Sequence, residues 1–171
     1  MAAVLHALEM KPLHDLFAIK GWRTPVFAPA TFKQLPSDVV VFFQAPGSMT
    51  KHLEAVFGGP IQIELVALDH SEQRYRRLVV LKNEQSRNPL LFACIEIFLD
   101  RFENRVRSEI QQARKPFGRI LEEMGTDHGY QPHAFFSFGP GTEIEHLLRS
   151  QPGYDLFGRT KTVLDSNKRL L

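Results

Sequence analysis

The sequence contains only one cysteine, Cys94, among its 171 residues. No disulfide can therefore form within the chain, and this cysteine usage is typical of a reducing compartment. Cys94 lies in an apolar run, which favours a buried structural thiol over a reactive nucleophile. We expect a cytoplasmic protein without a disulfide framework.

The sequence also lacks a strong charge of one sign. Its 21 Lys and Arg against 19 Asp and Glu give a formal net charge of +2. Duplex-binding proteins usually carry a basic excess or a basic stripe, so we expect no nucleic-acid partner. His6, Glu9 and Lys11 interrupt the apolar residues at the N-terminus before a long run can form. This pattern predicts neither a signal peptide nor a membrane-spanning helix, and therefore no membrane partner.

Internal repeats and low-complexity segments are missing as well. Hydrophobic residues make up 43% of the chain and charged residues 23%, which is an ordinary globular composition. A chain of this length buries enough surface for one core and rarely for two. We expect a single domain over residues 1–171, as a monomer or a dimer.

Metal and phosphate motifs are equally scarce. His128, His133 and His146 fall in a loop-rich part of the chain, but none belongs to an H-E-x-x-H pattern or a carboxylate-bracketed pair. The segment 139–141 (Gly-Pro-Gly) lacks the G-K-[ST] ending of a phosphate-binding loop and indicates a turn. We expect neither a metal nor a cofactor.

What the sequence does contain is a succession of short strand and helix patterns, interrupted by turn residues. We expect strands at residues 39–43, 61–65, 74–82, 90–99 and 160–164, and helices near residues 4–17 (bent or broken at Pro12), 49–57, 103–114, 117–124 and 143–149. Residues 24–36 indicate an irregular connection, and residues 129–141 carry no clear pattern. Three strands with short connections imply an antiparallel meander, so we predict an α+β fold with an antiparallel β-sheet and helices packed on one side.

Arg77 is the most informative single residue. Alternation along the strand 74–82 places it on the same face as Tyr75, Val79 and Leu81. If that face is inward, the guanidinium lies against the core, which is costly unless a carboxylate or another anion meets it. Periodicity by itself favours an internal ion pair, or an arginine at the sheet margin that reaches water.

Four short motifs occur in order and together resemble the chorismate lyase family. They are residues 48–51 (Ser-Met-Thr-Lys), 74–77 (Arg-Tyr-Arg-Arg), 116–121 (Pro-Phe-Gly-Arg-Ile-Leu) and 156–160 (Leu-Phe-Gly-Arg-Thr), followed by a turn and a Lys-x-Leu-Leu element. The resemblance covers residues 48–171 and implies a chorismate lyase-like fold. Members of the family convert chorismate to 4-hydroxybenzoate and pyruvate without a metal or an organic cofactor.

The resemblance also implies a substrate pocket. It assigns Arg77 to the substrate carboxylate, as both a catalytic and a substrate-binding residue, and it adds Met49 and Phe117 as further substrate-binding residues. Phe117 stands where the family usually has a leucine. The Arg77 assignment aligns residues 78–81 with the family, whereas an alignment on Tyr75 shifts the register by one residue.

Two features depart from the family pattern. The segment between Arg119 and Arg159 is longer than the resemblance leads us to expect, so residues 129–150 are predicted to be an insertion. The family's pocket glutamate follows shortly after the Lys-x-Leu-Leu element, whereas this sequence stops at Leu171. We therefore expect a final strand that is cut short and a pocket without that carboxylate.

Three hypotheses of function follow. The leading one is a chorismate lyase-like enzyme whose partner is a small aromatic carboxylate, chorismate or 4-hydroxybenzoate. The alternative is a non-catalytic domain that binds such a carboxylate, as in effector-sensing domains of bacterial regulators that resemble this fold. A third is a related lyase or hydrolase in which Glu143, Glu145 or His133 replaces the missing carboxylate.

Overall fold

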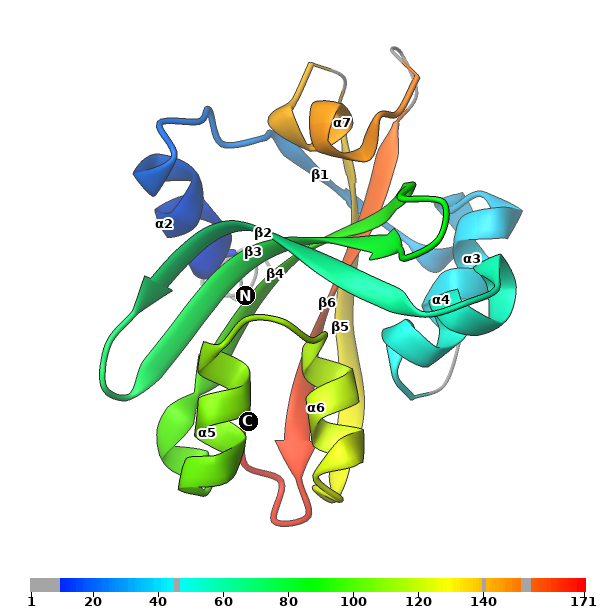
Figure 1. Ribbon diagram of the computed structural model, residues 1–171. Helices are drawn as coiled ribbons and strands as arrows, with labels where there is room; N and C mark the ends of the chain where they lie inside the picture. The colour runs from blue at the N-terminus through cyan, green and yellow to red at the C-terminus, as the bar shows by residue number, and fades with distance from the viewer. Residues whose placement is uncertain (1–9, 45–46, 140, 152–154) are drawn as a thin grey trace.

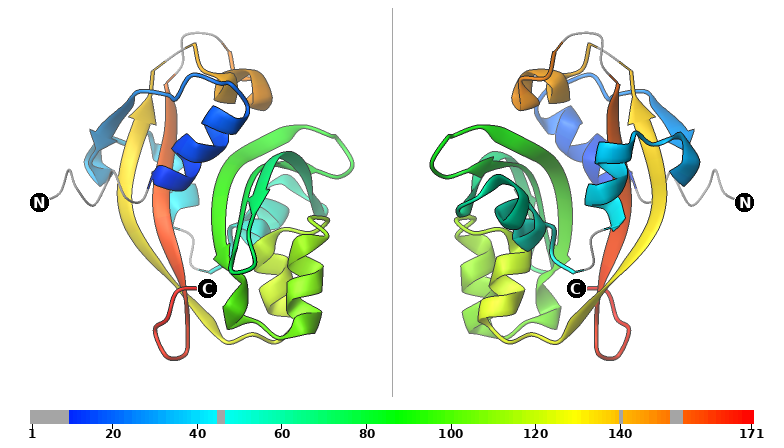
Figure 2. Two further views of the ribbon diagram at one scale, coloured as in Figure 1. Left: turned by 90° about the vertical axis from the view of Figure 1, so that its left-hand side faces the viewer. Right: turned by 90° about the vertical axis from the view of Figure 1, so that its right-hand side faces the viewer.

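The computed structural model describes residues 10–44, 47–139, 141–151 and 155–171. Its strands form two three-stranded antiparallel sheets, with helices packed around them (Figure 1). The predicted α+β class with antiparallel strands is confirmed, and the strands divide between the two sheets. Figure 2 shows the two sheets on opposite sides of the molecule, and in Figure 1 their strands cross in projection. No helix of the described residues is long and apolar enough to cross a membrane.

The first sheet is the predicted meander. It contains β2 (Ile61–His70), β3 (Arg74–Asn83) and β4 (Pro89–Phe98) in the order β2-β3-β4. As the central strand, β3 is paired along both edges, and hydrophobic clusters cover both of its faces, so residues 78–81 are all buried. The register places Arg77 opposite Leu68 on β2 and Ile95 on β4.

The second sheet contains β1 (Phe27–Ala30), β5 (His128–Phe138) and β6 (Leu156–Asp165) in the order β1-β5-β6. The expected irregular connection at residues 24–36 therefore contains a strand, followed by the 3-10 helix η1 (Phe32–Gln34). Pro29 is tolerated because β1 is an edge strand, where a missing N–H need not break the ladder.

The segment predicted as an insertion supplies the central strand of the second sheet. Residues 129–138 lie in β5, and the short helix α7 (Glu143–Leu148) follows, as predicted for residues 143–149. The strand pattern is concealed in the sequence because the register shifts between Pro132 and Ala134. Such a bulge interrupts the alternation of side chains along the strand.

The remaining helices are close to their predicted positions. They are α2 (Lys11–Ile19), α4 (Met49–Phe57), α5 (Asn104–Gln111) and α6 (Phe117–Glu123), with a 3-10 turn η2 (Leu99–Arg101) before α5. Pro12 lies in the first turn of α2 and does not break it, since the first turn of a helix does not need the missing N–H. The predicted helical residues 4–9 lie outside the described part of the chain.

The prediction of a strand at residues 39–43 is wrong, because these residues belong to the helix α3 (Ser37–Gln44). The run of valine and phenylalanine favours a strand locally, but β-propensity depends strongly on context. In the helix, Phe42 packs against His52 and Phe57 of α4, with ring centroids 5.1 and 5.8 Å away. This tertiary packing outweighs the local preference.

The two faces of β3 pack into different parts of the core. On one face Leu78 joins residues of α2, β5 and α7. On the other face Tyr75 joins residues of α5 and α6, and Val79 joins residues of α4 and β2. Arg77 lies between Tyr75 and Val79 on this second face, and so at the boundary between two hydrophobic clusters.

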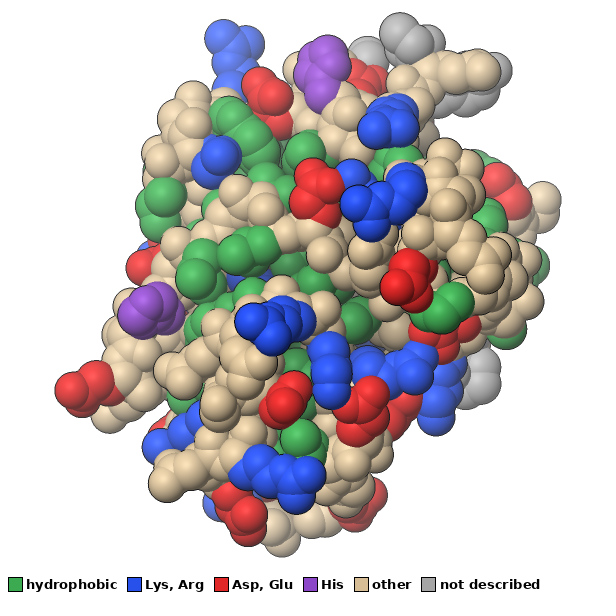
Figure 3. Space-filling model, viewed as in Figure 1, with side chains coloured by type: hydrophobic (Ala, Val, Ile, Leu, Met, Phe, Trp, Pro, Cys, Tyr) green, Lys and Arg blue, Asp and Glu red, His purple; other side chains and the backbone are tan. Residues whose placement is uncertain are grey.

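The face of the molecule in Figure 3 carries Lys and Arg interspersed with Asp and Glu over its lower part, around α5 and α6. Hydrophobic side chains gather over the meander in the same view. Beyond β6 the predicted return at residues 169–171 consists of an isolated bridge between Leu164 and Leu170.

Candidate functional site

The Arg77 side chain is fully buried, with 0% of its surface exposed. Its Nη2 atom donates a hydrogen bond to the carbonyl oxygen of Lys115 at 3.0 Å. The Nε and Nη1 atoms have no hydrogen-bond partner within the described residues, and no carboxylate there forms an ion pair with the guanidinium. Within the described residues, Arg77 therefore has neither the internal ion pair nor the access to water that periodicity favours.

Tyr75 is the nearest polar neighbour on the same face of β3. The centre of its ring lies 5.8 Å from the guanidinium carbon of Arg77, and its buried hydroxyl makes no hydrogen bond within the described part of the chain. Burial lowers the pKa of Arg77, and the adjacent Tyr75 acts in the opposite direction. Arginine nevertheless stays protonated in proteins. Arg77 is thus a buried cation with N–H groups that can bind an anion.

Phe117 comes to the same region because α6 begins directly after Pro116. The Lys115 carbonyl that accepts the Arg77 hydrogen bond lies two residues before Phe117. The Phe117 ring is buried and packs edge-to-face on Phe102, with 6.1 Å between the ring centroids. The predicted site residues Arg77 and Phe117 therefore lie on the two sides of one junction between β3 and α6.

Met49 begins α4, whose first turn touches the first turn of α6. A Cβ atom added to Gly118 would lie 2.7 Å from Ser48 Oγ, so the Gly118 backbone lies close to the Ser48 side chain. Met49 is half-buried and packs against the cluster that contains Val79, the next residue after Arg77 on the same face of β3. The three predicted site residues thus lie on β3, α4 and α6, three elements that pack near one another.

Ser48 is the residue that precedes α4, as predicted, but its side chain does not cap the helix. Its Oγ atom is buried without a hydrogen-bond partner among the described residues. An uncapped, buried hydroxyl is costly on its own. Ser48, Tyr75 and Arg77 therefore place several unsatisfied polar atoms around the same junction.

The two Gly-Arg motifs of the sequence have a structural explanation. At Gly158 an added Cβ atom would overlap the buried Phe136 ring, and at Gly118 it would crowd Ser48. Arg119 pairs with both carboxylate oxygens of Glu54 on α4, and Arg159 donates to the carbonyl oxygen of Phe43 on α3. Each motif therefore combines a close backbone approach with an anchor for α3 or α4.

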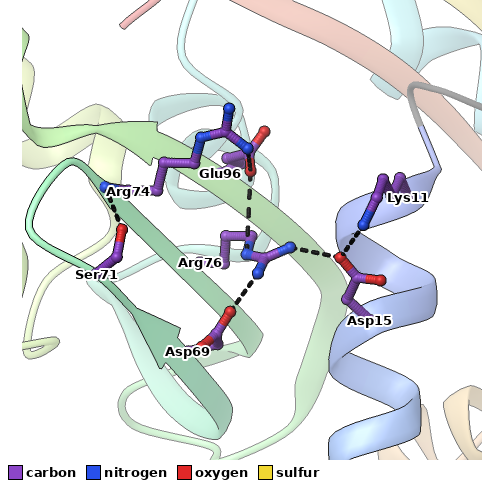
Figure 4. A network of polar contacts seen from close by, with 7 residues as sticks. All are labelled: Lys11, Asp15, Asp69, Ser71, Arg74, Arg76 and Glu96. Carbon is purple, nitrogen blue, oxygen red and sulfur yellow. Dashed lines mark hydrogen bonds and ion pairs between the residues drawn. The ribbon is translucent and has the colours of Figure 1, made fainter.

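Arg76 is the adjacent residue, and alternation along β3 places it on the opposite face from Arg77. Figure 4 shows the polar contacts of Arg76. Its Nη1 atom donates to Asp15 Oδ2 at 2.6 Å, its Nη2 atom bonds to Asp69, and its Nε atom lies 4.0 Å from Glu96. Burial lowers the pKa of Arg76, but the bonds to Asp15 and Asp69 outweigh this and raise it overall. Each nitrogen atom of the Arg76 guanidinium already faces a carboxylate, so none is left to bind a ligand.

The histidines and the cysteine do not form a reactive site in the described residues. No group of three or more His, Cys, Asp or Glu is placed there to hold a metal ion. His128 bonds to the Thr126 carbonyl and the Tyr130 hydroxyl, and His133 bonds to Thr162. Burial raises the pKa of the Cys94 thiol to about 12, so the thiol stays protonated at neutral pH.

A second cationic group, Arg159 with Lys161, was not singled out from the sequence. The available signal is their spacing, since residues two apart on a strand share a face. That signal is weak, because such pairs usually lie in water with a carboxylate nearby. Only the tertiary structure shows that both cations line one cavity.

Compared with known proteins, the chain matches no family model, and no curated protein was found to be a significant relative.

Proposed function

We propose that this chain binds a small aromatic carboxylate at Arg77 and acts as a chorismate lyase-like enzyme, which eliminates pyruvate from chorismate and leaves 4-hydroxybenzoate. One observation carries the proposal: Arg77 is fully buried, and its Nε and Nη1 atoms have no partner in the described residues. A buried, uncompensated charge is strongly unfavourable. A ligand carboxylate supplies both the missing charge and the missing acceptors.

The proposed reaction needs little chemical assistance from the protein. Chorismate already stores the driving force, because loss of pyruvate makes its ring aromatic. The bond between the ring and the ether oxygen breaks, the ring loses one proton, and the departing enolpyruvate gains one as it becomes pyruvate. The protein must desolvate and orient a dianion, and a fixed arginine in apolar surroundings is suited to that task.

The structure supports Arg77 over its neighbour as the anchor. Of the two adjacent arginines on β3, Arg76 is already bonded to Asp15 and Asp69. A substrate carboxylate would have to displace both. Arg77 needs no such exchange, so the register that aligns residues 78–81 with the family is the one we propose.

A specific observation favours the alternative, a non-catalytic domain that binds the same class of ligand. Proton transfer in the lyase reaction needs an acid–base group near the bound substrate. Within the described residues, no Asp or Glu is hydrogen-bonded to Arg77 or paired with it. A binding domain requires only the anchor and the apolar walls.

The third hypothesis, in which α7 supplies the carboxylate, receives no support from the packing. Ile144 of α7 lies in the cluster with Leu78, whose side chain points away from Arg77 across β3. Glu145 accepts hydrogen bonds from the backbone of Gly141 and Thr142 at the start of α7. His133 is exposed and bonds to Thr162.

The test is to incubate the full-length protein with chorismate and to follow 4-hydroxybenzoate by chromatography. We expect product well above the spontaneous rate, and a loss of roughly 30-fold or more in Arg77→Met, because the substrate carboxylate would then be buried without a partner. The matched control is Arg105→Met, which removes an exposed arginine on α5 and should leave the rate unchanged.

Calorimetry with 4-hydroxybenzoate separates the two candidates. Binding that depends on Arg77 but comes without turnover would select the binding domain. Binding and turnover that are both unaffected by Arg77→Met would overturn the assignment of Arg77 altogether.

A further inference from the structure

A second group of cations lies on the other sheet, on β6. Arg159 and Lys161 share one face of β6 and line a cavity of about 180 Å³. Residues of α3, the α3–α4 connection and β5 complete its wall: Phe43, Gln44, Gly47, Tyr130 and Pro132. The cavity is well below the roughly 300–1,000 Å³ of sites for drug-sized molecules, so it suits a compact ligand.

Aromatic rings and the backbone hold both cations in place. Lys161 Nζ lies 4.1 Å from the centre of the Tyr130 ring, and the guanidinium carbon of Arg159 lies 5.5 Å from that of Phe43. Arg159 also donates a hydrogen bond to the carbonyl oxygen of Phe43. The two side chains are therefore positioned before any ligand arrives, which reduces the entropy lost on binding.

Neither cation has a counter-charge among the described residues. Over residues 10–44, 47–139, 141–151 and 155–171, no Asp or Glu forms an ion pair or a hydrogen bond with Arg159 or Lys161. Burial lowers the pKa of Arg159, and burial together with the charge of Arg159 lowers the pKa of Lys161 to about 8. Two like charges are thus held together in a desolvated place, which costs stability in the absence of an anion.

We propose that the cavity between β5, β6 and α3 is a binding site for a compact dianion of the phosphate class, either inorganic phosphate or the phosphate group of a small monoester. Two fixed cations without a carboxylate match a double negative charge. Arginine provides a planar set of donors for phosphate oxygens, and lysine provides a point charge with three donors. The site uses none of the residues proposed to bind the aromatic carboxylate.

Calorimetric titration with inorganic phosphate at constant ionic strength and pH 7 tests the proposal. We expect saturable binding, weakened at least tenfold in Lys161→Met, and changed by less than about threefold in Lys161→Arg, which keeps the charge. The matched control is Lys20→Met, because Lys20 also lies over an aromatic ring, that of Trp22, but is exposed after the end of α2. A parallel titration with phenyl phosphate distinguishes a monoester site, which binds it more tightly, from a site for the free ion.

The pH profile provides a readout that a purely structural lysine would not give. The facing groups are Arg159, which stays charged, and Tyr130, whose pKa burial raises and whose hydroxyl bonds to His128. Phosphate affinity should rise as the ligand becomes a dianion and fall again above about pH 8, as Lys161 loses its proton. In Lys161→Arg the fall near pH 8 should disappear.

Several results would overturn the proposal. They are the absence of saturable phosphate binding to the wild-type protein, an equal loss of affinity in Lys20→Met, and phosphate binding that Lys161→Met leaves intact. Arg77→Met should leave phosphate binding unchanged, so a failure of the carboxylate site and a failure of this site are distinguishable. Binding of 4-hydroxybenzoate that requires Lys161 and not Arg77 would contradict both proposals.

Discussion

Arg76 and Arg77 are adjacent on β3, yet their guanidinium groups are in opposite situations. Arg76 is 20% exposed and contacts three carboxylates, those of Asp15, Asp69 and Glu96. Arg77 is fully buried and its one hydrogen bond within the described residues goes to a backbone carbonyl. A strand that places one arginine in a complete ion-pair network leaves the next one without a counter-charge.

The difference separates a structural role from a ligand-binding role. The Arg76 network joins α2 to the meander, because Asp15 lies on α2 while Asp69 and Glu96 lie on β2 and β4. The charged groups of this network neutralise one another, so the network can stabilise the fold without a ligand. Within the described residues, Arg77 joins β3 to Lys115, two residues before α6, and its unused donors reduce stability until an anion binds. The comparison therefore predicts effects of opposite sign.

The largest effect on stability should come from Arg76→Met. This change leaves Asp15, Asp69 and Glu96 close together without their shared cation, so like-charge repulsion replaces attraction. Because the network is partly exposed, we expect the free energy of unfolding to fall by about 2 kcal/mol, less than for a fully buried pair. Urea unfolding followed by circular dichroism measures this fall in the free energy of unfolding. A loss no greater than that in Arg105→Met would contradict a stabilising role for the network.

A smaller effect of the opposite sign should follow from Arg77→Met. The substitution removes a buried charge and keeps an apolar side chain of similar length, at the cost of one hydrogen bond to Lys115. We expect the ligand-free protein to become more stable by about 1 kcal/mol, because the desolvation penalty exceeds the value of that bond. The measurement is the same unfolding experiment without ligand. A marked loss of stability would mean that Arg77 is a structural residue.

The smallest expected effect is on the free energy of unfolding at acid pH. Hydrogen bonds from Lys11 and Arg76 lower the pKa of Asp15 below its ordinary 3.8. A carboxylate with a lowered folded-state pKa contributes stability above its unfolded pKa, and this contribution is lost as the pH falls through the folded value. The stability difference between wild type and Arg76→Met should therefore narrow by a few tenths of a kcal/mol below about pH 4. A difference that stays constant down to pH 2 would exclude Asp15 as the partner that matters.

Much of the fold follows from local patterns. The meander, α4, α6 and α7 appear where periodicity and turn residues indicate them, because each pattern matches the packing that the fold provides. Residues 39–43 and 129–138 were not predictable in the same way. The first run is helical because Phe42 packs on α4, and the second strand is concealed by a bulge.

The candidate site, too, could be predicted from the sequence only in part. Alternation placed Arg77 on one face with Tyr75, Val79 and Leu81 and left open whether that face is inward, and the family resemblance singled out Met49 and Phe117 in addition to Arg77. Neither could show whether a carboxylate from elsewhere in the chain meets Arg77. The cavity with Arg159 and Lys161 was not predictable because Phe43, which contacts Arg159, comes from α3, and Tyr130, which contacts Lys161, comes from β5. Their approach depends on how the second sheet packs against the helices.

The sequence by itself determined that Arg76 and Arg77 point to opposite faces of one strand, because side-chain alternation is a property of extended backbone. It also determined the meander, through short turns between alternating segments. Only the tertiary structure decided which arginine has counter-charges, since Asp15 reaches Arg76 from a helix 61 residues earlier in the chain. Backbone geometry acts locally, whereas the neutralisation of a buried charge depends on every segment that packs around it.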